Sequence, residues 1–128
     1  MTDQELIGPI EIRVPPNPSR SRVLRLAASG MASLAGFTVD EIEDIKIAVS
    51  EVLIALIEHG EGQPIDLQFM VDDQLFSVSG RTAVDQFDTE DSDLILCRTV
   101  LAEVSGSHGI DVIENQAHIW AAVSHAMI

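Results

Sequence analysis

The sequence predicts an α+β fold, a two-layer sandwich in which three helices cover one face of a mostly antiparallel mixed sheet. Segments that alternate apolar and polar residues, as half-buried strands do, and segments with apolar residues at helical spacing follow one another in the order β-α-α-β-β-α-β-β. Two adjacent helices, and two pairs of adjacent strands, favour this sandwich over a regular alternation of strands and helices. The 128 residues are expected to form a single domain, 1-128.

The first strand and the first helix are expected before residue 37. Residues 10–14 alternate and predict a strand, which the two prolines that follow bring to an end. Asn17 is suited to cap a helix whose first position is Pro18, and Gly36 provides the stop. The buried face of this helix is predicted to consist of Val23, Leu26, Ala27, Gly30, Met31 and Leu34.

The second helix is expected to be the central one. Thr38 and Glu41 have the spacing of a capping box, and Phe37 and Ile42 flank it where a hydrophobic staple requires them. The helix is predicted to run to about His59. Because its second half is apolar almost all round, we expect it to be covered on several sides.

A hairpin is predicted after this helix. Residues 65–71 alternate, residues 72–73 form a turn, and residues 75–79 return as a second strand. Residues 80–91 are polar and are predicted to be irregular.

A third helix and a last hairpin complete the chain. The helix is marked by apolar residues at helical spacing and ends at Gly106; these residues are Leu94, Cys97, Leu101 and Val104. Residues 110–113 and 118–123 predict two strands that turn at residues 114–116.

The charge of the chain restricts its partners. A formal net charge of −14 argues against direct binding of nucleic acid or of an anionic membrane, because phosphate binding requires clustered Lys and Arg. Four of the seven basic residues lie in the first fifth of the chain: Arg13, Arg20, Arg22 and Arg25. The acidic remainder serves solubility, or it forms a surface that attracts a basic protein.

Three features indicate a cytoplasmic protein. No apolar run approaches the roughly 18 residues of a membrane span. Residues 1–5 are acidic and do not resemble the start of a signal peptide. The single cysteine, Cys97, cannot form an internal disulfide, which fits a reducing compartment.

One stretch, residues 44–60, carries a family resemblance. The matching residues are Asp44, Lys46, Ala48, Val49, Ser50, Glu51 and His59. In this register the stretch resembles the nucleotide-site helix of the small GHKL-type (HATPase_c-like) serine/threonine-protein kinases that act as bacterial anti-sigma factors. That helix reads roughly D-(L/I)-(K/R)-(L/I)-A-V-(S/G/D)-E-A-x-x-N-A-(I/V)-x-H. The resemblance implies a histidine kinase-like ATPase fold for nearly the whole chain.

The nucleotide residues of that family are largely missing, so the resemblance is to a degenerate member. Ala55 replaces the family Asn that holds Mg²⁺, and a methyl group cannot coordinate a hard cation. Residues 79–85 contain one glycine where the family has Asp-x-Gly-x-Gly, and Asp85 stands several residues late. Residues 91–97 have two carboxylates where the family has a phosphate-binding glycine pair. No nucleotide-binding residues and no cofactor are therefore expected.

The resemblance also implies partners. Family members often have an Asn-x-x-x-x-Arg segment at the first helix, and Asn17 and Arg22 match it. In the family this surface binds a sigma factor and its rival, a STAS anti-anti-sigma protein, in a partner-switching system. The sequence thus predicts a regulatory protein that binds such partners through Asn17, Arg20 and Arg22. A homodimer formed through the sheet is also implied.

Two other functions stay open. The chain could be a divergent ATP-dependent serine/threonine protein kinase that phosphorylates a STAS antagonist, with Glu51 as the catalytic base and ATP and Mg²⁺ as cofactors. It could also be a scaffold for other histidine kinase-like proteins. A metal site is not expected, because the four histidines show no ligand spacing. A hydrolase is not supported, because Ser50 and Ser79 have no neighbouring base in the sequence.

Overall fold

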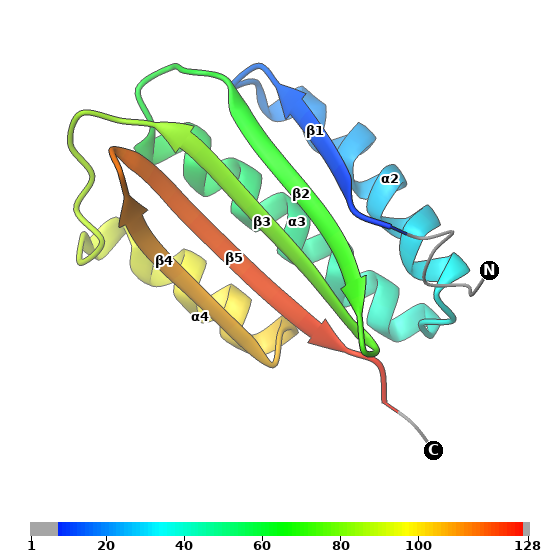
Figure 1. The fold of residues 1–128 in the computed structure, drawn as a ribbon. Coiled ribbons are helices and arrows are strands. Elements are labelled where there is room, and N and C mark those ends of the chain that lie inside the picture. Colours follow the sequence, from blue (N-terminus) through cyan, green and yellow to red (C-terminus); the bar gives the residue numbers. More distant parts are fainter. Residues whose placement is uncertain (1–7, 127–128) are drawn as a thin grey trace.

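A computed structural model describes residues 8–126, and these residues form the predicted α+β sandwich. The elements are β1 (Ile10–Val14), η1 (Pro18–Arg20), α2 (Ser21–Leu34), α3 (Val39–His59), β2 (Ile65–Asp72), β3 (Leu75–Ala83), η2 (Ser92–Leu94), α4 (Ile95–Val104), β4 (Ser107–Ile113) and β5 (Gln116–Ser124). The three α-helices lie side by side on one face of the sheet (Figure 1). The acidic residues 1–5 lie outside the described residues.

The sheet is antiparallel at every pairing, so the prediction of a mixed sheet is wrong in that detail. The strand order is β1-β2-β3-β5-β4, and each neighbouring pair runs antiparallel. β3 and β4 are joined through α4 and run in the same direction, as in a crossover unit. However, β5 lies between β3 and β4, so these two parallel strands do not pair with each other.

The element boundaries differ from the prediction mainly in the strands. β3 continues to Ala83, four residues beyond 79, and β4 begins at Ser107 rather than at residue 110. The two hairpin turns lie at residues 73–74 and 114–115, where all four residues have positive φ. Such two-residue turns match the twist of the flanking strands. Each strand therefore keeps pairing until its tight turn.

The N-terminal caps are confirmed, with one change at the first helix. The side chain of Asn17 accepts a hydrogen bond of 2.9 Å from the backbone N–H of Ser19, but it caps the short 3₁₀ turn η1. The α-helix proper begins at Ser21. At α3, the Thr38 hydroxyl accepts the N–H of Glu41 at 3.2 Å, and the Glu41 carboxylate accepts the N–H of Thr38 at 2.7 Å.

The carboxylate of Glu41 also ties the end of the chain to the start of α3. It accepts hydrogen bonds of 2.7 Å from the backbone N–H of Ala126 and from His125 Nδ1. Burial raises the pKa of Glu41, but the bonds from the N–H groups of Thr38 and Ala126 and from His125 outweigh it and lower the pKa to about 2. Glu41 therefore caps α3 and also binds residues 125 and 126 to the start of that helix.

α3 lies at the centre of the helical layer, as predicted. Seven of its residues are buried: Ile45, Ala48, Val49, Val52, Leu53, Ala55 and Leu56. The helix comes close to the sheet at Gly80 of β3. A Cβ at this glycine would lie 2.6 Å from Leu56 Cδ1 and 2.8 Å from Val52 Cγ1. The missing side chain of Gly80 thus sets how closely α3 approaches the sheet.

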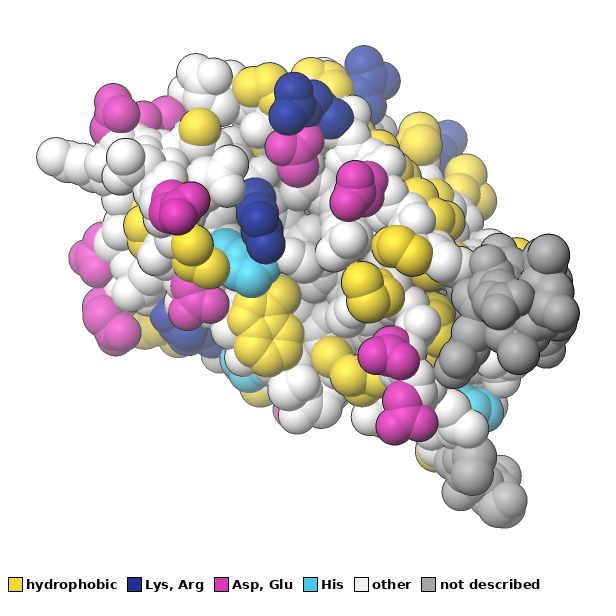
Figure 2. Space-filling model, viewed as in Figure 1, with side chains coloured by type: hydrophobic (Ala, Val, Ile, Leu, Met, Phe, Trp, Pro, Cys, Tyr) yellow, Lys and Arg dark blue, Asp and Glu magenta, His cyan; other side chains and the backbone are white. Residues whose placement is uncertain are grey.

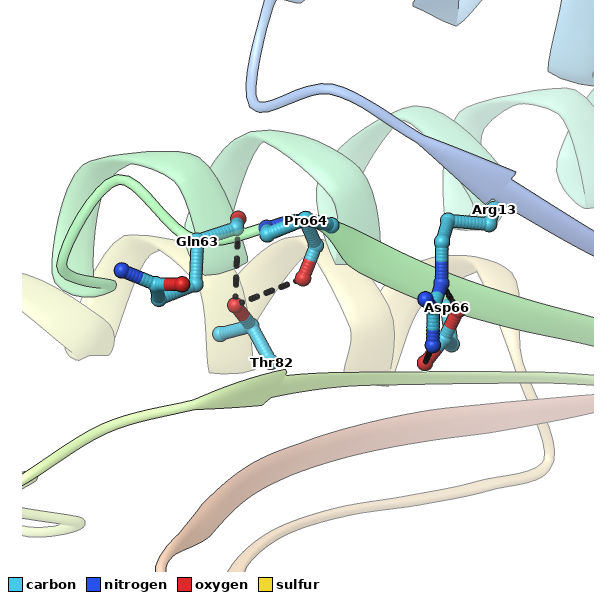
Figure 3. A network of polar contacts seen from close by, with 5 residues as sticks. All are labelled: Arg13, Gln63, Pro64, Asp66 and Thr82. Carbon is cyan, nitrogen blue, oxygen red and sulfur yellow. Dashed lines mark hydrogen bonds and ion pairs between the residues drawn. The ribbon is translucent and has the colours of Figure 1, made fainter.

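Polar side chains join β2 to its neighbouring segments on both sides (Figure 3). The buried hydroxyl of Thr82 donates to the carbonyl groups of Gln63 and Pro64, which connect α3 to β2. The Arg13 side chain binds both carboxylate oxygens of Asp66, at 2.7 and 3.1 Å, and so joins β1 to β2.

Among residues 8–126 no helix is long and apolar enough to cross a membrane.

The predicted buried face of α2 is wrong. Val23, Leu26 and Leu34 are 56%, 68% and 74% exposed, and Gly30 is also exposed. The buried residues are instead Ser21, Leu24, Ala28, Met31 and Ala32; of the predicted face, Met31 is buried and Ala27 is partly buried against the core. Apolar residues line two faces of α2, and helical spacing alone does not decide which of them faces the core.

A polar contact shows how the orientation of α2 is fixed. The guanidinium of Arg25 donates to the hydroxyls of Ser21, at 3.0 Å, and Ser50, at 3.2 Å. The two hydroxyls are 3.2 Å apart and hydrogen-bond each other. Ser50 belongs to α3, so this group orients α2 against α3. Its role was not evident from the sequence.

Candidate functional site

The centre of the candidate site is a line of three residues along α3, Glu51, Ala55 and Glu58, which we call the α3 stripe. Their spacing of four and three residues puts them on one side of the helix. Burial, and then the charge of Glu58, raise the pKa of Glu51. Burial, and then the charge of Glu51, raise the pKa of the Cys97 thiol on α4 to about 11. The carboxylates of Glu51 and Glu58 are therefore close enough to α4 for their charges to raise the pKa of Cys97.

Ala55 is only 4% exposed and packs in the core. A buried methyl group offers no oxygen to a cation. Because Ala55 stands between the carboxylates of Glu51 and Glu58, the α3 stripe is negatively charged. Its side chains offer no hydrogen-bond donor to a phosphate. Among residues 8–126, no cluster of three or more His, Cys, Asp or Glu side chains is placed to hold a metal ion. The α3 stripe could act as a base through Glu51, but it has no built cation site.

The segment after β3 begins later in the chain than the sequence predicts. Because β3 ends at Ala83, Asp85 stands two residues after the strand. Counted from Asp85, Phe87 and Thr89 stand at the spacing of the two glycines of Asp-x-Gly-x-Gly. The boundary was misjudged because residues 80–83 have no alternating apolar pattern, and only pairing with β2 and β5 shows that they belong to the strand.

The loop after β3 is held against the end of α3. The carboxylate of Glu61 accepts the backbone N–H groups of Asp85, at 2.9 and 3.0 Å, and Gln86, at 3.1 Å. The ring of Phe87 packs edge-on against His59, with centroids 6.4 Å apart. The loop therefore already has partners within the protein.

At the start of the third helical segment, a backbone N–H group is likewise already bound by a carboxylate of the protein. Asp91 accepts a hydrogen bond of 2.9 Å from the backbone N–H of Asp93, at the first turn of η2. In a phosphate site, backbone N–H groups of this kind bind the ligand. Here a carboxylate of the protein is bound to one of them, and the carboxylate of Asp93 adds a second negative charge.

Two grooves lie outside the α3 stripe. One of about 520 Å³ is on the outer face of the sheet and is lined by residues of β1, β2, β3 and β5. The other, of about 710 Å³, lies between residues 87–89 and residues 110–113 of β4. Neither is lined by a residue of α3. They give the α3 stripe no ligand cavity.

The predicted partner-binding residues are gathered at the start of α2. Arg20 and Arg22 are exposed, and they lie at the end of η1 and in the first turn of α2. Asn17 is close in sequence, but its side-chain oxygen is used as the cap. Figure 2 shows the opposite side of the molecule, the outer face of the sheet, where acidic, basic and apolar side chains are mixed.

The outer face of the sheet holds a polar pair that the sequence did not reveal. Ser79 Oγ and His118 Nε2 are 2.8 Å apart, and His118 Nδ1 is 3.9 Å from an oxygen of Asp111. Burial, and then the charge of Arg81, lower the pKa of His118, whereas Asp111 raises it. Ser79 does have a neighbouring base, but β3 pairs on both sides, so the backbone N–H groups near it belong to the ladders and form no oxyanion hole.

Comparison with known proteins identifies sequence relatives of one kind. No protein-family model matches the chain. It is 50% identical over 50 residues to the serine-protein kinase RsbW of Bacillus subtilis, a match that covers 39% of this chain and 31% of that protein. It is 30% identical over 107 residues to RsbW of Bacillus licheniformis, covering 80% of this chain and 63% of the relative. The chain thus spans between about a third and two thirds of the length of these curated relatives.

Solved structures share the fold. A Mycobacterium tuberculosis structure of RsbU and RsbW domains superposes over 94% of this chain and 33% of that chain, with a TM-score of 0.74 and 15% identity. A chain of the SiaB-SiaC complex of Pseudomonas aeruginosa superposes over 89% of this chain and 88% of that chain, with a TM-score of 0.67 and 11% identity. At these identities the likeness concerns the fold.

Proposed function

We propose that this chain, a homologue of the RsbW serine-protein kinases, is a cytoplasmic regulator that binds a sigma factor, a STAS anti-anti-sigma protein, or both, without transferring phosphate. The proposal rests chiefly on one observation, the buried methyl group of Ala55 between two carboxylates where the kinases of the resembled family hold Mg²⁺. Phe87 and Thr89 at the glycine positions, and the Asp91 cap, support it. The chain would act as one module, 1-128, and as a homodimer.

The proposed loss of the nucleotide site gives the first prediction. In a calorimetric titration with ATP or ADP at physiological Mg²⁺, the chain should show no measurable binding, because it lacks the Mg²⁺ ligand and the flexible glycines. Ala55→Asn should also fail to bind, since Phe87 and Thr89 still hinder the approach of the backbone to phosphate. RsbW of Bacillus subtilis is the positive control. Micromolar affinity of the unmodified chain would revive the kinase alternative.

The alternative is a divergent serine/threonine protein kinase that phosphorylates a STAS antagonist. Two observations favour it: Asp85 stands two residues after the end of β3, and burial and Glu58 raise the pKa of the candidate base Glu51. ATP and Mg²⁺ would then be cofactors. Transfer of labelled phosphate from ATP to the STAS partner, abolished by Glu51→Gln, would establish this activity.

The second prediction concerns partner binding through α2. Arg22→Ala should weaken the binding of the sigma factor or STAS protein at least tenfold, about 1.4 kcal/mol, because an interface arginine contributes bidentate hydrogen bonds and stacking. Arg13→Ala is the matched control, since Arg13 lies on β1 and is paired with Asp66. The partner is first recovered from the native cell and purified, and its affinities are measured by calorimetry. If the unmodified chain and Arg22→Ala bind the partner with equal affinity, the start of α2 is not part of the interface.

A further inference from the structure

The outer side of α2 carries a line of apolar residues that no other element among residues 8–126 covers. Val23, Leu26, Gly30 and Leu34 follow one another at intervals of three, four and four residues, which places them on one side of a helix. We call them the α2 outer stripe. α2 lies at the edge of the helical layer beside α3 (Figure 1), and its three large outer residues are each more than half exposed. Side chains of this size in one line indicate a contact surface.

The glycine in the middle of the α2 outer stripe contacts none of residues 8–126 where a side chain would stand. Gly30 lies inside a regular helix, and nothing is within 4 Å of the position that a Cβ would occupy. Glycine in a helix interior is less stable than alanine there. Neither packing nor backbone conformation among residues 8–126 requires a glycine at position 30. A second helix that crosses at this point would explain it, because small side chains at the crossing let two helix axes approach more closely.

The charge around the α2 outer stripe indicates what kind of helix this would be. Arg20 and Arg22 lie at its N-terminal end, and no acidic residue occurs between residues 12 and 39 of a chain with a net charge of −14. The N-terminal end of the α2 outer stripe therefore carries two positive charges and no negative charge from its own helix. A second copy of α2 would bring only further arginines to the contact. A helix of another protein with carboxylates at one end complements both the apolar line and the arginines.

We propose that the α2 outer stripe binds an amphipathic helix of the partner protein, which crosses α2 at Gly30 and places carboxylates against Arg22 and Arg20. The inference rests on the proposed function and adds to it the element of the partner that is recognised. Leu26 and Leu34 then contact the apolar face of the bound helix, one on each side of the crossing. The arginines determine the direction in which that helix lies.

The test combines stability and affinity. Gly30→Ala should raise the melting temperature of the free chain by about 2–5 °C, because alanine favours the helix and its methyl group meets nothing. Gly30→Leu should fold equally well but bind the purified sigma factor or STAS protein at least tenfold more weakly. Ala102→Leu, on the exposed side of α4, is the control and should keep full affinity.

The outcomes separate this inference from the function on which it rests. If Arg22→Ala weakens binding and Gly30→Leu does not, the helix crossing is wrong and the regulatory function stands. If neither a sigma factor nor a STAS protein binds the unmodified chain, both fail. A lower melting temperature for Gly30→Ala would show that the fold needs this glycine. The oligomeric state of the free chain is measured by sedimentation. If the unmodified chain is a dimer and Leu26→Ser is a monomer, a second copy of the chain occupies the α2 outer stripe, and the proposal is wrong.

Discussion

Gly80→Val is expected to lower the free energy of unfolding by about 3 kcal/mol, the upper part of the usual range for overpacking a core. The first carbon of the new side chain would lie 2.6 Å from Leu56 Cδ1 and 2.8 Å from Val52 Cγ1, well inside contact distance. Either α3 moves away from β3 or both side chains leave their rotamers. Urea unfolding followed by far-UV circular dichroism measures the loss.

Ala83→Val is the control for this substitution. It adds bulk to the same strand at an exposed position and should change the stability by no more than about 0.5 kcal/mol. Similar losses for the two variants would show that β3 tolerates no added volume anywhere. Stability of Gly80→Val close to that of the unmodified chain would mean that α3 is not seated as closely as described. Because α3 carries Glu51, Ala55 and Glu58, its seating also sets the position of the candidate site.

Leu56→Ala is expected to cost about 2–5 kcal/mol, as large-to-small changes in a core do. Leu56 is only 1% exposed and lies between α3 and the sheet, where its loss leaves a cavity. The same unfolding measurement applies. A loss below about 1 kcal/mol would indicate that the surrounding core collapses into the space.

Combining Leu56→Ala with Gly80→Ala tests the contact itself. The methyl group added at Gly80 enters the space that Leu56 Cδ1 has left, so the double variant should be more stable than the sum of the two single losses predicts. Coupling of more than about 0.5 kcal/mol is expected for residues in direct contact. Additive losses would show that the two positions do not meet.

Local signals in the sequence were sufficient for the order of the elements. The capping box at Thr38, the stop at Gly36 with its φ of +86°, and the alternating residues of β2 each act over a few neighbouring residues. Hydrogen bonds and dihedral preferences at this range do not depend on the rest of the chain. The family resemblance could be recognised from the sequence for the same reason, because the matching residues lie within one helix.

The end of β3 and the surroundings of Ser79 depend on other strands. Residues 80–83 became a strand through pairing with β2 and β5, so Asp85 stands two residues after the strand rather than several. Pairing of β3 with β5 brought His118 to Ser79 from 39 positions away in the chain. No local pattern contains such contacts, because register is set where separate strands meet.

By itself, the sequence determined the order of the helices and strands, the capping box of α3, and that a methyl group stands at Ala55. The spacing of apolar residues also predicted the buried face of α4, with Cys97 and Leu101. Only the tertiary structure decided which side of α2 faces the core. Both sides of α2 are apolar, and packing against α3, together with the bond from Arg25 to Ser50, leaves Leu24 and Met31 inside and Leu26 and Leu34 outside. The physical reason is that periodicity records how often apolar residues recur, whereas the rotation of a helix is set by contacts with neighbours distant in the chain.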